Sequence, residues 1–332
     1  LGIQPWNFPL YQVIRYACAN IMAGNTTVLK HAGNVFGMAE KIEQLFKLAG
    51  FDDYCFKNLL IDGKTASELI DHSAIRGVTF TGSDGTGKKV AERAAKQVKK
   101  TVLELGSNDA YIVLDDADLN TAITACTQGR LINNGQTCVA AKRFIVVDAL
   151  YDDFKALIKE QFEQVVLGDP NDEKTTLGPM ARKDLRDQLH QQVTDSVNAG
   201  ATIITGGKVA EHTGFYYTPT LLENIKPGMP AYDDELFGPV ASLIRAKDNA
   251  EAMQIANDSR YGLGGGIFSK DEQAAIELAK LHFDTGMVNI NGYGLAQPNL
   301  PFGGVKDSGY GREHGGFGLR EFVNIKTIMV ND

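Results

Sequence analysis

The chain has 332 residues and a formal net charge of −8 at pH 7, with 43% hydrophobic and 22% charged residues. A chain of this length is longer than one hydrophobic core usually supports, so two domains are expected. The negative net charge argues against a nucleic-acid or membrane surface as the main partner. The four cysteines lack paired or metal-type spacing, which indicates reduced thiols in a cytoplasmic protein and predicts no metal site.

Helix and strand signals alternate from the start of the chain to Leu105. Proline suits the first position of a helix and glycine the position after it, and apolar runs between such signals predict buried strands. The predicted elements are helix 10–22, strand 26–30, helix 35–49, strand 58–61, strand 75–81, helix 87–99 and strand 101–105. This alternation favours a parallel sheet covered on both faces.

The same alternation restarts after Asp115 and predicts a second α/β domain. Its predicted elements are helix 119–132, strand 143–147, helix 151–166 and helix 182–200. Near the end of the chain, residues 322–330 alternate apolar and polar side chains, the pattern of a half-buried strand that can pair with another chain. The expected domains are 1–105, 106–314 and a C-terminal segment, 315–332.

Cys138 follows an apolar lead-in that gives way to small and amide residues, Leu131-Ile132-Asn133-Asn134-Gly135-Gln136-Thr137-Cys138. Such a stretch is expected to turn sharply and to leave its last side chain exposed. A thiol there could be a nucleophile, although a lone cysteine is more often a small buried hydrophobe. Other motifs in the sequence are needed to choose between these two interpretations of Cys138.

A candidate phosphate-binding turn spans residues 78–87, where glycines separate a predicted strand from a helix. The first N–H groups of a helix are unpaired and its macrodipole favours an anion. Gly82 would let the backbone approach a pyrophosphate, and Ser83 would add a hydroxyl. The run matches neither the Walker pattern nor the standard dinucleotide fingerprint, so an ordinary strand-to-helix turn is an equally good interpretation.

Several short motifs occur in one order along the chain: Pro5-Trp6-Asn7-Phe8-Pro9, Phe80-Thr81-Gly82-Ser83, Leu103-Glu104-Leu105-Gly106, Asn134-Gly135-Gln136-Thr137-Cys138, Glu235-Leu236-Phe237-Gly238-Pro239 and Pro301-Phe302-Gly303-Gly304. In these motifs the chain resembles the aldehyde dehydrogenase superfamily. Leu29-Lys30-His31-Ala32 and Gly178-Pro179-Met180-Ala181-Arg182 are similar to the bacterial NAD(P)-dependent succinate-semialdehyde dehydrogenases.

The resemblance implies an α/β fold with a Rossmann-like cofactor domain, a catalytic domain and a C-terminal oligomerisation strand, assembled as a homodimer or homotetramer. Because the chain opens inside the first motif, the opening part of the cofactor domain is expected to be missing.

The resemblance implies catalytic roles for Cys138, Glu104 and Asn7. Cys138 would attack an aldehyde, and the Asn7 amide would stabilise the resulting oxyanion. Glu104 would activate the water that hydrolyses the thioester, with a pKa raised by an apolar pocket. Without the resemblance, Asn7 would be interpreted as a capping residue before a helix and Glu104 as a surface glutamate.

The resemblance also implies contacts with NAD or NADP. Lys30 would reach the adenosine ribose, Gly82 and Ser83 the pyrophosphate, Glu235 the nicotinamide ribose and Phe237 the nicotinamide. The simpler interpretation of Glu235 is a solvated member of an acidic run.

Gly33 stands where strict NAD users often carry a glutamate, which would repel the 2′-phosphate of NADP. Lys30 remains available to pair with that phosphate, so NADP is expected to be accepted as well as NAD. His31 and Ser107 replace a common proline and a glycine of the family pattern, and the sequence suggests no role for Ser107.

Arg15 lies eight residues after Asn7, a separation of about 12 Å on a helix at ~1.5 Å per residue. It matches one of the two arginines that bind the substrate carboxylate in animal succinate-semialdehyde dehydrogenases. The second position holds Ile132, with Arg130 two residues earlier. Phe302 would line the aldehyde tunnel. Succinate semialdehyde is thus the expected substrate, with glutarate semialdehyde as a rival. The simpler interpretation of Arg15 is an arginine on a helix surface, and that of Phe302 is a core phenylalanine.

Two other classes of function stay open. A cysteine hydrolase or acyltransferase could use the thiol and a glutamate, but such thiols usually rely on histidine, and no histidine lies in a matching motif. A non-catalytic family member is the other, and the presence of Asn7, Glu104 and Cys138 speaks against it.

Overall fold

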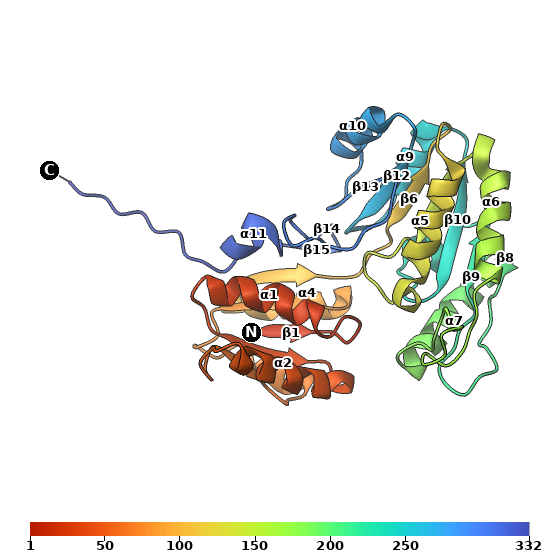
Figure 1. Ribbon diagram of the computed structural model, residues 1–332. Coiled ribbons are helices and arrows are strands. Elements are labelled where there is room, and N and C mark those ends of the chain that lie inside the picture. Colours follow the sequence, from red (N-terminus) through yellow and green to blue (C-terminus); the bar gives the residue numbers. More distant parts are fainter. Residues whose placement is uncertain (332) are drawn as a thin grey trace. The chain divides into compact units, whose positions relative to one another are not determined.

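The computed structural model describes residues 1–331, which form two compact units (Figure 1). The first unit comprises Leu1–Leu105, Ala296–Gly303 and the described residues from Gly309 onward, and the second comprises Gly106–Leu295 and Gly304–Ser308. The division after Leu105 falls where the first predicted domain ends, but residues 296–303 and 309–314 pack with the first unit. The assignment of functions to these domains stays a prediction.

A six-stranded sheet forms the centre of the first unit, in the order β15-β5-β4-β1-β2-β3. Its strands are β1 (Gly2–Gln4), β2 (Thr27–His31), β3 (Phe56–Asn58), β4 (Gly77–Thr81), β5 (Lys100–Glu104) and β15 (Gly309–Tyr310). The first five are parallel, and β15 runs antiparallel to β5.

The helices of the first unit cover both faces of its sheet. They are α1 (Tyr11–Met22), the 3-10 turn η1 (Gly33–Val35), α2 (Phe36–Leu48), α3 (Gly63–Leu69), α4 (Asp84–Lys96) and α11 (Gly315–Arg320). Apolar residues of α1 and α2 share one core with β2 and β3, whereas those of α4 share another with β4 and β5. The chain leaves β1 and β4 in opposite directions, so a topological switch point lies between them, where open α/β sheets bind ligands.

The second unit is built on a seven-stranded sheet in the order β13-β12-β6-β7-β10-β9-β8, parallel except for β8. Its strands are β6 (Ala110–Val113), β7 (Arg143–Val147), β8 (Thr202–Thr205), β9 (Thr220–Glu223), β10 (Val240–Ala246), β12 (Gly265–Phe268) and β13 (Asn289–Ile290). A separate antiparallel pair joins β11 (Tyr261–Gly262) to β14 (Val305–Lys306).

Two layers of helices cover this second sheet. One layer is α5 (Leu119–Leu131) and α6 (Asp148–Glu163), which lie side by side in Figure 1, and α5 continues into the 3-10 turn η2 (Ile132–Gly135). The other layer contains α7 (Lys183–Asn198), α8 (Pro230–Asp233), α9 (Asn249–Asn257) and α10 (Glu272–His282). Among the described residues, no helix is both long and apolar enough to cross a membrane.

The predicted alternation of helices and strands is confirmed, with two kinds of correction. Strand β3 ends at Asn58, where the prediction began its strand. The short elements β1, α3 and β6 were not predicted, and neither were the elements from β8 to α11. The predicted strand 322–330 is not formed in the single chain, and its pairing with another chain stays a prediction: residues 323–331 form neither helix nor strand, and Ile325 is 98% exposed. A strand needs a neighbour for its hydrogen bonds, and no strand within residues 1–331 pairs with this segment.

Candidate active site

The parallel strands of the first unit end in register at one edge of its sheet. Gln4 of β1 pairs with His31 of β2, and Thr81 of β4 pairs with Glu104 of β5. Because parallel strands place their carboxyl ends together, this edge gathers the predicted site residues that belong to the strand ends and the loops after them. They are Asn7, Lys30, Gly33, Gly82, Ser83 and Glu104.

Glu104 closes β5 with its side chain buried at 1% exposure, and neither carboxylate oxygen has a hydrogen-bond partner among residues 1–331. Burial raises the pKa of Glu104 well above its ordinary value, and nearby Glu313 raises it further, whereas Arg15 acts in the opposite direction. The main chain at Gly303 lies so close that a Cβ there would stand 2.9 Å from Glu104 Oε1. A raised pKa makes a carboxylate a better proton acceptor, as a general base must be.

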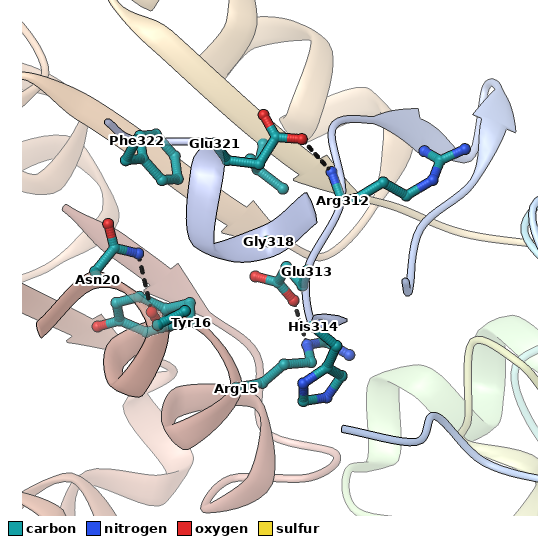
Figure 2. A pocket seen from close by; sticks show the side chains of 11 residues that line it. Arg15, Tyr16, Asn20, Arg312, Glu313, His314, Gly318, Glu321 and Phe322 are labelled. Carbon is teal, nitrogen blue, oxygen red and sulfur yellow. Dashed lines mark hydrogen bonds and ion pairs between the residues drawn. The ribbon is translucent and has the colours of Figure 1, made fainter. Parts of the chain in front are cut away.

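Arg15 is buried on α1 and forms an ion pair with Glu313, drawn as a dashed line in Figure 2. Its guanidinium carbon lies 4.4 Å from the centre of the Phe302 ring, and its Nη2 lies 3.5 Å from Thr81 Oγ1. Arg15 is therefore not a helix-surface residue, and it has a carboxylate partner within the chain. Its role toward a substrate carboxylate, and that of the buried Phe302 in an aldehyde tunnel, stay predictions.

His31 holds the loop that carries Asn7. The His31 ring is fully buried, its Nδ1 accepts the N–H of Ala32 at 3.0 Å, and its Nε2 lies 2.9 Å from the carbonyl oxygen of Pro9. With Nδ1 accepting from Ala32, Nε2 is the nitrogen that donates to Pro9, and Nδ1 also lies 3.3 Å from the carbonyl oxygen of Gln4. Burial lowers the pKa of His31 and keeps the ring neutral. His31, which the sequence showed only as a departure from the family pattern, thus fixes the main chain at Pro9, two residues after the half-buried Asn7.

The start of α4 fits an anionic group. Ser83 is the N-cap of this helix, yet its hydroxyl lies 3.1 Å from Thr86 Oγ1 and does not cap the first-turn N–H groups. A side chain at Gly85 would meet no atom within 4 Å, so space is open at the helix start. A helix start that its N-cap side chain does not cap, beside a topological switch point, suits the pyrophosphate of a dinucleotide.

The end of β2 fits an adenosine ribose. Lys30 is half-buried, and burial lowers its pKa while Asp62 acts in the opposite direction. A Cβ at Gly33 would have only the Phe36 ring near it, at 3.8 Å. The edge of the sheet therefore offers a cation and an unfilled position, which suits NADP as well as NAD.

In the second unit, Cys138 follows a sharply turned segment, as predicted. Asn133, Asn134 and Gly135 have φ angles of 51°, 57° and 68°, three successive residues in the left-handed region. Cys138 itself is partly exposed, although its neighbours Thr137 and Val139 are buried. The thiol is thus less exposed than the sequence suggested, because the chain re-enters the core on both sides of it.

Segments far apart in the sequence hold this turn. The Asn134 side-chain amide donates to the carbonyl of Pro179 at 3.1 Å, and the Ala181 N–H donates to Gln136 Oε1 at 2.9 Å. Arg130 is fully buried and donates to the carbonyl oxygens of Gly135 at 2.7 Å and Val240 at 3.2 Å. Arg130, considered above as a neighbour of the second arginine position, thus supports the main chain of the turn.

Glu235 lies among buried polar groups of the second unit. Its Oε1 is 3.1 Å from Lys142 Nζ, and it accepts the backbone N–H of Ser107. Burial raises the pKa of Glu235, while Lys142 lowers it. A paired carboxylate with lone pairs to spare suits the hydroxyls of a ribose, and Phe237, two residues on, is half-buried.

The sequence interpretation missed Lys142. A charged residue directly before a strand of five buried residues, Arg143–Val147, was the signal that could have found it.

Comparison with known proteins identifies the family. The family model described as the aldehyde dehydrogenase family matches residues 1–328. The chain belongs to the aldehyde dehydrogenase family. It is similar to a protein of Deinococcus radiodurans named succinate-semialdehyde dehydrogenase [NADP(+)], with 47% identity over 99% of this chain and 69% of the relative. An Escherichia coli succinate semialdehyde dehydrogenase [NAD(P)+] is 46% identical over 99% of this chain and 71% of its own length.

The solved structures agree with this aldehyde dehydrogenase fold. A crystal structure of the succinic semialdehyde dehydrogenase of Streptococcus pyogenes in complex with NADP+ superposes with a TM-score of 0.97 at 40% identity. The match covers 100% of this chain and 72% of that one. In this aldehyde dehydrogenase, the first unit brings together Asn7, Glu104 and the predicted adenosine and pyrophosphate contacts, and the second unit holds Cys138, Glu235 and Phe237.

Proposed function

We propose that this aldehyde dehydrogenase oxidises succinate semialdehyde to succinate with NAD or NADP. The environment of Glu104 carries the proposal, because a buried carboxylate with a raised pKa and no hydrogen-bond partner is suited to activating water. The relatives named for succinate semialdehyde support the choice of substrate.

The reaction begins with addition of the Cys138 thiolate to the carbonyl carbon, which forms a thiohemiacetal oxyanion. The Asn7 side-chain amide and the Cys138 backbone N–H donate hydrogen bonds to that oxyanion. A bound nicotinamide cofactor supplies the acceptor for the two electrons and the hydrogen that leave the carbonyl carbon. Lys30, Ser83 and Glu235 are proposed to hold this cofactor.

Oxidation leaves a thioester on Cys138, which water must cleave. Glu104 takes one proton from the water as its oxygen attacks the acyl carbon, and the thiolate leaves. The products are the carboxylate, reduced cofactor and two protons, one of which Glu104 passes on to solvent.

Arg15 is proposed to recognise the distal carboxylate of the substrate. The contact requires the guanidinium to share its charge between the substrate and Glu313, because the two carboxylates would compete for the same donors. Arg15 has five N–H donors, enough for both partners in principle.

The mechanism is tested by comparing Cys138→Ala with Glu104→Gln in a single turnover. Cys138→Ala should form no reduced cofactor, whereas Glu104→Gln should form one equivalent in a burst and then turn over ~10²–10⁴-fold more slowly. Equal bursts in both variants would overturn the assignment. Ester cleavage without any reduction of cofactor would favour a cysteine hydrolase.

The substrate is tested by comparing specificity constants for succinate semialdehyde and butanal, an uncharged aldehyde of equal length. Arg15→Leu should lower the ratio by an amount that corresponds to ~1.5–3 kcal/mol. Arg93→Leu, which removes a half-buried arginine of α4 paired with Asp71, is the matched control and should leave the ratio unchanged. An unchanged ratio in Arg15→Leu would show that Arg15 does not bind the substrate carboxylate.

We also propose that the protein is cytoplasmic and forms a homodimer or homotetramer through its C-terminal segment. The exposed apolar side chains of Ile325, Ile328 and Met329 support pairing with a second copy. The scattered cysteines of the sequence suit a reducing compartment.

A further inference from the structure

A buried ammonium group lies directly against the main chain of the nucleophile. Lys142 is 2% exposed, and its Nζ is 2.5 Å from the carbonyl oxygen of Cys138 and 3.2 Å from that of Thr137. The same Nζ lies 3.1 Å from Glu235 Oε1 and 3.2 Å from Ser107 Oγ. An ammonium has three protons to donate, and its hydrogen-bond acceptors here are the two carbonyl oxygens and Ser107 Oγ, while Glu235 is its ion-pair partner.

Ser107 adds a second contact to the same carbonyl. Its Oγ is 2.6 Å from the carbonyl oxygen of Cys138 and 2.5 Å from Asp109 Oδ1, which also accepts the Gly264 N–H at 3.0 Å. The hydroxyl has one proton and can donate to only one of these acceptors. Burial raises the pKa of Asp109, while Lys142 and the hydrogen bond from Ser107 lower it. A glycine at position 107 could make none of the contacts that the Ser107 hydroxyl makes.

We propose that Lys142 is a positioning residue that holds the main chain of Cys138 and, through its ion pair, the carboxylate of Glu235. This rests on the proposed function, in which Cys138 is the nucleophile and Glu235 binds the cofactor. The Ser107 hydroxyl assists Lys142 at the Cys138 carbonyl, and the Ser107 backbone N–H contacts Glu235.

Two physical effects follow from this arrangement. A neighbouring ammonium favours the reactive thiolate form of a cysteine, so loss of Lys142 should make Cys138 less reactive. Removing one partner of a buried ion pair leaves the other charge without compensation, so loss of Lys142 should also disturb Glu235 and weaken cofactor binding. One side chain thus controls two properties that would otherwise be independent.

The test uses Lys142→Met in the full chain and two measurements that need no aldehyde. The first is the rate constant for alkylation by iodoacetamide, read at Cys138 by peptide mass spectrometry because the exposed Cys18 reacts as well. The second is the dissociation constant for NADP, measured by titration calorimetry. Lys142→Met should slow alkylation and weaken NADP binding, each by about tenfold or more, as loss of a charged hydrogen bond predicts.

Two further variants separate positioning from general damage. Ser107→Gly removes the hydroxyl but keeps the backbone N–H to Glu235, so it should slow alkylation and leave NADP binding unchanged. Lys155→Met breaks another ion pair of the second unit, in which Lys155 Nζ lies 2.6 Å from Glu223 Oε2, and should change neither quantity.

The proposal is overturned if folded Lys142→Met, with native circular dichroism, keeps the wild-type value of either quantity. If Lys142→Met does not fold, Ser107→Gly decides, and alkylation at the wild-type rate then overturns the proposal. Failure of the proposed function is distinguishable: a wild-type protein that does not oxidise aldehydes, but whose variants show the expected losses, refutes the activity and leaves the positioning role in place.

Discussion

Replacing Glu104 with glutamine should make the first unit more stable at neutral pH while it slows catalysis. Glu104→Gln keeps the size of the side chain and removes its charge. The wild-type carboxylate is buried at 1% exposure, and neither oxygen has a hydrogen-bond partner, so the fold bears the cost of desolvating a charge. Leaving a buried polar group unsatisfied costs ~1–3 kcal/mol, and more when it is charged.

The sign of the effect depends on pH. Because burial raises the folded-state pKa of Glu104 above its ordinary value of 4.5, the protonated form favours folding. That contribution is fully present below pH 4.5 and is lost as the pH rises through the folded-state pKa. Glutamine is neutral throughout, so the variant should match the wild type in acid and exceed it at neutral pH by ~1–3 kcal/mol.

The assay is urea unfolding followed by tryptophan fluorescence at several pH values. Trp6 is the single tryptophan of the chain and belongs to the first unit, so its emission reports on the unit that contains Glu104. Glu92→Gln, which changes an exposed glutamate of α4 paired with Lys96, serves as the control and should bring no gain at neutral pH. If Glu104→Gln is less stable than the wild type by the same amount at every pH, the carboxylate is held by favourable contacts and the reasoning is refuted.

Three other perturbations have defined outcomes. Arg15→Leu and Glu313→Gln break the same ion pair, but they should shift the acid limb of the turnover–pH profile in opposite directions. Arg15 lowers the pKa of Glu104 and Glu313 raises it, so Arg15→Leu should move the limb to higher pH and Glu313→Gln to lower pH. Shifts of the same sign would point to a common folding defect. Gly33→Glu should raise the ratio of the NAD to NADP specificity constants by about tenfold or more, because the new carboxylate repels the 2′-phosphate. The variant should keep its stability, because the nearest side-chain atom is 3.8 Å from the new Cβ. An unchanged ratio would show that the phosphate binds elsewhere. Deleting the chain after Phe322 should reduce the assembly measured by sedimentation to a smaller species, and an assembly of unchanged size would contradict the proposed role of that segment.

Elements with strong local signals could be predicted closely. Helix α1 ends at Met22 as predicted, and β7 spans Arg143–Val147 as predicted. Capping residues and apolar periodicity act between near neighbours in the chain, which is why the sequence determines such elements. The strands β1 and β6, of three and four residues, carry too short a pattern to be recognised before the sheet is known.

The candidate site divides in the same way. The sequence by itself determined that the chain turns before Cys138, because amide residues and glycine tolerate the left-handed backbone of that turn. It also determined that Glu104 ends a strand. The structure alone decided that Glu104 has no hydrogen-bond partner, that Arg15 meets Glu313, and that Lys142 lies against the Cys138 carbonyl. These facts depend on how strands and loops distant in sequence pack together, and no local pattern of residues encodes which buried charges will become neighbours.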